Sequence, residues 1–295
     1  MFRVDAFTRR RFSGNPAVVV LEADDLTSSD MQALACDLHR GDTAFVLQPD
    51  GPGHDLKLRF FTATRELPFV GHATVAAHFA LGLNGTPRPA RTRQLTGAGI
   101  IDVEVRGQGA ERTIAMTMAP PTLGNTLNES DKASVLDALG LSSADLDPLC
   151  PLQVALKGGT RLMIGLQSAQ QLDGLRPDLG VLRRLSAHLG SDGYFVFARH
   201  GVKDGCLTEA RVFCPAIGVD EDPVSGNAHG MLGVYLLAHK LLAPTDGRAT
   251  FTGLQGRALG RPGRVLVELA TQRENVAAVT VVGEAVLVYR TTLEI

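Results

Sequence analysis

The sequence lacks the marks of several large functional classes. Its 29 basic and 31 acidic residues give a net charge of −2, so the basic excess that nucleic-acid binding requires is missing. Its four cysteines include no CxxC pair, and a chain of 295 residues does not need a disulfide framework. No stretch comes near the ~18 apolar residues of a membrane span.

The start of the chain also lacks the apolar stretch of a secretory signal peptide, because Asp5 interrupts it and Arg9–Arg11 follow. We interpret these three arginines, the one short basic run, as a solvated turn between strands. Together the absences predict a soluble, reduced, cytoplasmic protein that binds neither nucleic acid nor a membrane.

The motifs of metal, nucleotide and hydrolase sites are missing as well. No HExxH, CxxC or EF-hand pattern occurs, so we expect no metal site. No Walker loop and no GxGxxG after a strand occur, so we expect no bound nucleotide. No GxSxG elbow occurs, and Ser225 beside Gly226 has no other feature of a serine hydrolase around it.

What the chain does contain is a mixture of strands and helices along its whole length, which predicts an α/β (α+β) protein. A chain this long tends to form two domains. A double proline at 120–121 cannot continue a central strand, and the polar stretch 122–130 that follows is predicted to be a linker. We therefore expect an N-terminal lobe at 1–121 and a C-terminal lobe at 122–295, with the last strand able to pack with the N-terminal lobe. Helices are expected at 27–38, 72–83, 130–139, 181–189 and 227–242, and the last two strands at 277–282 and 285–289.

An internal repeat relates the two halves. The segment Glu66-Leu-Pro-Phe-Val-Gly-His-Ala73 matches Glu221-Asp-Pro-Val-Ser-Gly-Asn-Ala228 at Glu, Pro, Gly and Ala without a gap. Each copy follows a strand that contains Phe and precedes an apolar helix of the kind that is buried. Downstream, a Thr-Gly pair at 96–97 matches another at 252–253. We infer a duplicated unit in which β-structure wraps around one central helix.

The glycines of the repeat, Gly71 and Gly226, allow close approach to the first turn of each helix. The free N–H groups of a helix start carry partial positive charge and bind anions such as carboxylates. One such glycine is most simply a helix-entry residue. Two at equivalent positions favour a pair of anion-binding helix ends.

Three ionisable side chains near these helices are candidates for chemistry. Asp222 either stabilises the second helix start or acts as a catalytic acid or base, and local sequence leaves both open. His72 begins the first helix, where an imidazolium is disfavoured, so a neutral donor to substrate is expected. His229 lies inside the second helix and is interpreted as a packed or bridging residue.

These segments resemble the PhzF (phenazine biosynthesis-like) family, whose fold is that of diaminopimelate epimerase and proline racemase. The resemblance covers nearly the whole chain. Its most specific part is the pairing of Glu-Leu-Pro-Phe-x-Gly-His with Glu-Asp-Pro-x-Ser-Gly. The segments that carry it are 4–8, 14–19, 42–46, 59–62, 66–74, 213–215, 218–226, 255–256 and 260–262.

The resemblance implies two facing lobes with the active site between them, no cofactor and usually a homodimer. The best-known activity of the family is isomerisation of a dihydro-hydroxyanthranilate by proton transfer. In that enzyme a glutamate moves the proton, and Asp42 occupies its position here with a side chain one methylene shorter. The family's Gly-Ser pair reads Gly226-Asn227, whereas His72 and Asp222 match directly.

The racemase relatives use two cysteines, and Val70 and Ser225 occupy those positions here, so a two-thiol racemase is not expected. The leading hypothesis is an isomerase or epimerase that transfers a proton at carbon on a small carboxylate-bearing metabolite. Asp42 would move the proton, and His72 and Asp222 would polarise or position the substrate. Backbone groups at Gly71-His72-Ala73 and Gly226-Asn227 would bind its carboxylate. A true epimerase and a catalytically silent ligand-binding protein remain as alternatives.

Overall fold

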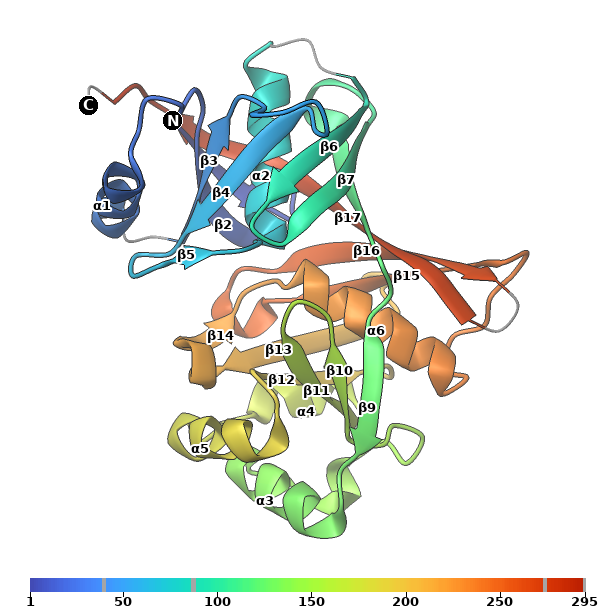
Figure 1. The fold of residues 1–295 in the computed structure, drawn as a ribbon. Coiled ribbons are helices and arrows are strands. Elements are labelled where there is room, and N and C mark those ends of the chain that lie inside the picture. The colour runs from blue at the N-terminus through green and yellow to red at the C-terminus, as the bar shows by residue number, and fades with distance from the viewer. Residues whose placement is uncertain (39–40, 86–88, 273–274, 294–295) are drawn as a thin grey trace. The chain divides into compact units, whose positions relative to one another are not determined.

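The computed structural model describes residues 1–38, 41–85, 89–272 and 275–293 (Figure 1). The chain forms two compact units, Met1–Met118 with Thr280–Ile295, and Ala119–Val279. The division into lobes at 1–121 and 122–295 that the sequence predicted remains a prediction. The last strand, β17 (Asn275–Arg290), begins in the second unit and ends in the first.

The first unit arranges its strands around one apolar helix, α2 (Gly71–Leu83). This helix packs against β1, β2, β3 and β8, and every residue from Ala73 to Leu81 is buried. A second helix, α1 (Ser28–Leu38), covers β3 and β4 through Met31 and Ala35, and Thr27 caps it by accepting from the Asp30 N–H. The strands of the unit are β1 (Phe2–Ala6), β2 (Asn15–Val20), β3 (Asp42–Leu47), β4 (Leu56–Phe61), β5 (Glu66–Leu67), β6 (Arg91–Thr96), β7 (Gly99–Arg106) and β8 (Thr113–Met118).

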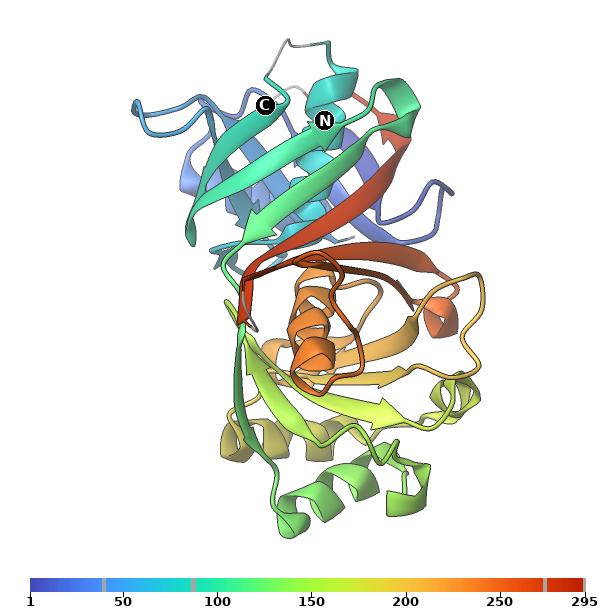
Figure 2. The same ribbon diagram turned by 90° about the vertical axis from the view of Figure 1, so that its right-hand side faces the viewer.

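The second unit surrounds another apolar helix, α6 (Gly226–Ala238), which Figure 2 shows in orange among the strands of its unit. This helix packs against β10, β11 and β16. The opposite face of the sheet forms a separate core with three helices, α3 (Glu129–Leu139), α4 (Ala169–Gly174) and α5 (Leu179–Leu189). The strands are β9 (Thr122–Thr126), β10 (Gln153–Leu156), β11 (Thr160–Leu166), β12 (Tyr194–Ala198), β13 (Thr208–Cys214), β14 (Val219–Asp222), β15 (Arg248–Gln255) and β16 (Gly263–Gln272).

Three local predictions were wrong. The polar stretch read as a linker contains β9, because its backbone pairs with β10 and polar side chains suit a half-exposed strand. The two last predicted strands are one strand, since β17 runs without a break through Gly283 and pairs with β1 only beyond it, from Ala285 to Arg290. The second apolar helix ends at Ala238 rather than 242, where Lys240 adopts φ +58° and the N–H groups of Leu241 and Leu242 return to the Leu236 carbonyl.

Strand register corrects the alignment of the two halves downstream of the repeat. Leu56 of β4 pairs with Gln94 of β6, and the equivalent Thr208 of β13 pairs with Gly253 of β15. Gln94 therefore corresponds to Gly253, and the Thr-Gly pair at 96–97 corresponds to Gln255-Gly256 rather than to 252–253. The two glycines that now correspond, Gly97 and Gly256, have the same structural role, because each packs against the proline of its own repeat. A Cβ at Gly97 would lie 2.9 Å from Pro68 Cα, and one at Gly256 would lie 2.7 Å from the Pro223 carbonyl oxygen.

The two halves fill the space between helix and strand in opposite ways. In the first, Thr74 on α2 donates to the Val70 carbonyl and receives a hydrogen bond from Gln94. In the second, His229 replaces the threonine and its Nδ1 lies 2.8 Å from the Ser225 carbonyl. Its ring occupies the space that Gly253 leaves, since a Cβ there would lie 2.2 Å from His229 Cδ2. The predicted packing role of His229 agrees with this burial, which leaves it 0% exposed.

Replacing Gly253 by Ala should overpack this contact and destabilise the protein by about 1–3 kcal/mol. The double variant with His229→Ala should recover part of that loss, which gives a measurable coupling energy in a double-mutant cycle of chemical unfolding. Gly174→Ala is the matched control, because a Cβ there meets nothing within 4 Å. Simple additivity of the two changes would contradict the contact.

Candidate active site

The first unit brings Asp42 and His72 together. Asp42 begins β3, and His72 is the second residue of α2. His72 Nε2 lies 3.5 Å from Asp42 Oδ2, and the two side chains are 13% and 23% exposed. Gly41 makes this position possible, because its φ is +108° and a Cβ there would lie 2.5 Å from the Pro16 carbonyl oxygen.

The carboxyl group of Asp42 has an unusual protonation equilibrium. Burial disfavours its charged form and raises its pKa from 3.8 to about 6. Such a group is ionised at neutral pH and is a stronger base than an exposed aspartate. That combination suits a side chain that takes a proton from substrate near pH 7.

The start of α2 leaves backbone donors available beside this pair. Val70 at the N-cap provides no side-chain acceptor. Among the residues that the structure describes, no acceptor binds the N–H groups of Gly71 and Ala73. These donors and the helix dipole favour an anion next to Asp42 and His72.

We call α2 and α6 the motif helices, because each follows one copy of the repeat. A bidentate ion pair holds the turn in front of each of them. Arg59 donates through Nε and Nη2 to Glu66 at 2.8 and 2.7 Å, and its guanidinium lies 5.1 Å from the Phe61 ring centre. Arg211 binds Glu221 in the same way at 3.0 and 2.8 Å. Sequence reasoning recognised the two glutamates as part of the repeat but not their partners, although each arginine stands two residues before a phenylalanine.

In the second unit, a buried amide fixes the turn that contains Asp222. Gln255 donates from Nε2 to the Asp222 carbonyl at 2.6 Å and accepts from the Ser225 N–H at 3.0 Å. Gln255 is 1% exposed. The sequence had marked it only as part of the family resemblance, because its partners become apparent only from the register of β13 and β15.

The start of α6 differs from the start of α2. Ser225 caps it, since its Oγ accepts from the Ala228 N–H at 3.4 Å. The N–H groups of Gly226 and Asn227 have no acceptor in the described part of the chain. The Asn227 side chain donates from Nδ2 to the Lys157 carbonyl at 3.0 Å, so it anchors the turn between β10 and β11.

The structure thus groups the predicted residues by unit. Asp42, His72, Gly71 and Ala73 surround one helix start. Asp222, Gly226 and Asn227 surround the other. Their joint action on one substrate stays a prediction.

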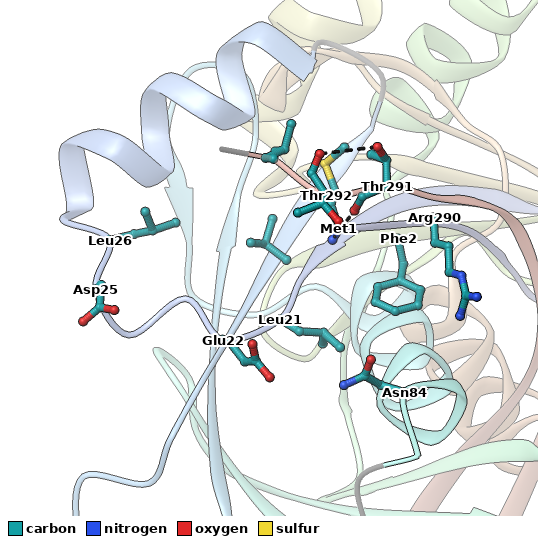
Figure 3. A pocket seen from close by; sticks show the side chains of 12 residues that line it. Met1, Phe2, Leu21, Glu22, Asp25, Leu26, Asn84, Arg290, Thr291 and Thr292 are labelled. Carbon is teal, nitrogen blue, oxygen red and sulfur yellow. Dashed lines mark hydrogen bonds between the residues drawn. The ribbon is translucent and has the colours of Figure 1, made fainter. Parts of the chain in front are cut away.

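The pocket drawn in Figure 3 is not part of this site. It has a volume of about 680 Å³ and is lined by both chain ends, with Met1 and Thr291 joined by hydrogen bonds. It reaches α2 at Asn84, the C-cap of the helix whose first turn carries His72. Since 13 residues of helix span about 20 Å, the pocket is remote from Asp42.

The described residues contain no group of three or more His, Cys, Asp or Glu side chains placed to hold a metal ion. None of their helices has the length and apolar character to cross a membrane.

Comparison with known proteins identifies the class. The chain is 38% identical over 293 residues to an uncharacterised isomerase of Clostridium acetobutylicum, covering 99% of this chain and 97% of the relative. It is 31% identical over 280 residues to trans-2,3-dihydro-3-hydroxyanthranilate isomerase of Pseudomonas aeruginosa, covering 95% and 94%. The protein is therefore an isomerase.

The family follows from a match over residues 4–291 to the model of phenazine biosynthesis-like proteins, and the chain belongs to this PhzF family. A PhzF-family crystal structure from Bacillus anthracis matches with a TM-score of 0.89 at 26% identity, covering 100% of this chain and 98% of that one. A hydroxyproline epimerase from Agrobacterium vitis matches with a TM-score of 0.57 at 15% identity, covering 97% and 90%. The second match shows a shared α/β fold, as the resemblance implied.

The raised pKa predicts that Asp42 weakens the fold at neutral pH. Its stabilising contribution is complete below pH 4 and is lost as pH rises through about 6. Asp42→Asn should therefore raise the free energy of unfolding above pH 7, by up to about 3 kcal/mol at 1.36 kcal/mol per pKa unit. Urea unfolding at pH 4.5 and pH 8 measures this, and the gain should be smaller at pH 4.5.

Asp25→Asn, which removes an exposed carboxylate, is the matched control and should change stability little at either pH. Equal stabilisation by both variants at pH 8 would mean that net charge, rather than burial of Asp42, is responsible.

Proposed function

We propose that this isomerase transfers a proton at carbon on a small carboxylate-bearing metabolite, without a cofactor. The observation that carries the proposal is the partly buried Asp42, whose pKa is raised to about 6, with His72 Nε2 3.5 Å from its carboxylate. A carboxylate of this kind serves as a general base for a C–H group and returns the proton to a neighbouring carbon.

In the proposed mechanism, the substrate carboxylate binds at the helix starts, where the N–H groups of Gly71, Ala73, Gly226 and Asn227 have no acceptor among the described residues. Asp42 removes the proton from carbon. Neutral His72 donates a hydrogen bond to the polar group on which negative charge develops. The mechanism thus draws on the backbone groups of both copies of the repeat.

Asp222 supplies the second ionisable group of the proposal. Gln255 and the Arg211–Glu221 pair hold the backbone on both sides of it, which limits how far its carboxylate can move. A fixed carboxylate at this place can orient a hydroxyl or amino group of the substrate. We also propose that the protein acts in the cytoplasm as a homodimer.

The substrate class is narrowed by the relatives. The Pseudomonas enzyme is named for a dihydro-hydroxyanthranilate, a cyclic carboxylate with neighbouring amino and hydroxyl groups. Asp42 is one methylene shorter than the glutamate that the resemblance places there, and a misplacement of ~1 Å costs on the order of a hundredfold in rate. We therefore propose a related cyclic or amino-acid carboxylate rather than that compound itself.

Two alternatives have observations in their favour. A true epimerase would fit the epimerase fold, although Val70 and Ser225 replace the two thiols of the racemase relatives. A silent binding protein would fit the shortened Asp42 side chain and Asn227, whose Nδ2 is engaged by the Lys157 carbonyl. Stereochemistry at the reacting carbon separates the first alternative, and hydrogen exchange separates the second.

The test is deuterium incorporation at carbon in heavy water, followed by mass spectrometry on a panel of cyclic and amino-acid carboxylates that includes the dihydro-hydroxyanthranilate. Uptake should rise with pH around a midpoint near 6, because the ionised form of Asp42 is the base. Asp42→Asn should abolish uptake and still bind the ligand.

Full activity of the Asp42→Asn variant would show that another group moves the proton. If no compound exchanges while some raise the melting temperature, the silent binding protein is correct.

A further inference from the structure

Arg161 lies on the face of β11 that α6 covers. Side chains alternate along the strand, and Leu162, Ile164 and Leu166 belong to the core on the opposite face with α3, α4 and α5. Arg161 and Met163 therefore face α6, which packs against this strand. A charged residue on this face is unexpected unless something balances its charge.

Asp192 and Asp222 lie in its neighbourhood, but no carboxylate in the described part of the chain forms an ion pair with Arg161. The Arg161 side chain makes one hydrogen bond to the described residues, from Nη1 to the Thr160 carbonyl at 2.7 Å. Its Nε is buried and has no partner among them. The nearby Asp192 carboxylate accepts instead from the Thr160 N–H at 2.8 Å. Leaving a charged donor without an acceptor in a buried place is costly.

The group that packs against the Arg161 side chain is an uncharged thiol, that of Cys214. A Cβ at Gly193 would lie 3.3 Å from Arg161 Cδ and 2.5 Å from Cys214 Sγ, so the absence of a side chain at Gly193 lets these two lie close together. Burial raises the pKa of the Cys214 thiol to about 12, so the thiol stays neutral and cannot serve as a counterion.

The same thiol locates Arg161 near the proposed site. The charge of Arg161 acts to lower the pKa of Cys214, and the charges of Asp222 and Asp192 act to raise it, so all three groups lie near this one sulfur. The turn between β10 and β11 approaches from the other side. Asn227 binds it through the Lys157 carbonyl, and a Cβ at Gly159 would lie 3.7 Å from Arg161 Nη1.

We propose that Arg161 binds the anionic group of the substrate, as a side-chain counterion that complements the backbone N–H groups of Gly226 and Asn227. This inference rests on the proposed function and adds specificity to it. The guanidinium supplies the fork of donors that matches a carboxylate, and its Nη2, which makes no hydrogen bond to the described residues and is not among the buried atoms, gains an acceptor on binding. The protein would therefore select substrates whose carboxylate lies on the α6 side and reject their uncharged analogues.

The test compares one ligand with and without its charge. The probes are 3-hydroxyanthranilate, its uncharged carboxamide, and a panel of acetate, benzoate and L-proline, measured by calorimetry with the wild type, Arg161→Gln and Arg161→Lys. Arg161→Gln should weaken carboxylate binding about 10–100-fold and leave carboxamide binding within about twofold, as expected for a charged hydrogen bond. Arg161→Lys keeps the charge without the fork and should lie between.

Arg183→Gln is the matched control, because Arg183 lies on α5 in the same unit and, among the described residues, donates to the Pro215 carbonyl alone. It should bind every probe as the wild type does. Equal carboxylate binding by wild type and Arg161→Gln would overturn the proposal, and so would a wild type that binds no carboxylate of the panel. If Arg161→Gln does not fold, full carboxylate affinity in Arg161→Lys together with unchanged selectivity over the carboxamide overturns the fork geometry.

The result is independent of the catalytic assignment. Binding is repeated in the Asp42→Asn background, where turnover is absent. If the wild type takes up no deuterium but Arg161→Gln still weakens carboxylate binding, only the proton-transfer proposal is rejected. Normal uptake with no Arg161 effect would reject the anion-binding role alone.

Discussion

The structure depends on a strand, a turn and a buried helix that are held together by an arginine–glutamate fork. Backbone N–H donors and one candidate site side chain, His72 or Asp222, lie at or beside the start of each motif helix. The position of the turn in front of the helix determines where these groups point. A fork between Arg59 and Glu66, and another between Arg211 and Glu221, connects the turn to the strand before it. Two parallel hydrogen bonds resist rotation better than one, so each fork restricts the turn relative to its strand.

The two units share this arrangement but differ in the groups at the start of the motif helix. In the first, the helix start has no side-chain cap and faces a buried carboxylate, so it combines an anion-attracting backbone with a base. In the second, Ser225 caps the helix and Gln255 binds the turn at both ends, so this copy has additional hydrogen bonds in place of the buried carboxylate. The two copies of the repeat thus share one scaffold and differ in the groups that surround their helix starts.

Much of this could be predicted from the sequence, and the reasons for the rest are physical. The two apolar helices α2 and α6 and the repeat before them follow from local composition, which determines burial, although the end of α6 at Ala238 does not. The roles of Gln255 and Arg161 do not, because each depends on which residue lies beside it in the next strand. The misaligned Thr-Gly pair has the same cause, since strand register is a long-range property. The polar strand β9 was missed because pairing to β10, not its own side chains, makes it a strand.

The exchange of Thr74 and Gln94 for His229 and Gly253 has a consequence for how such a pair can arise. If both halves descend from one threonine–glutamine arrangement, a histidine that came first would have met a side chain in the space its ring needs. Loss of the strand side chain first leaves only a hole, which a folded protein tolerates more readily at a modest cost. From such an ancestor, the path through the strand glycine is the less costly order of the two changes. Neither the histidine nor the glutamine can be moved alone into the other half without a steric clash with its partner position.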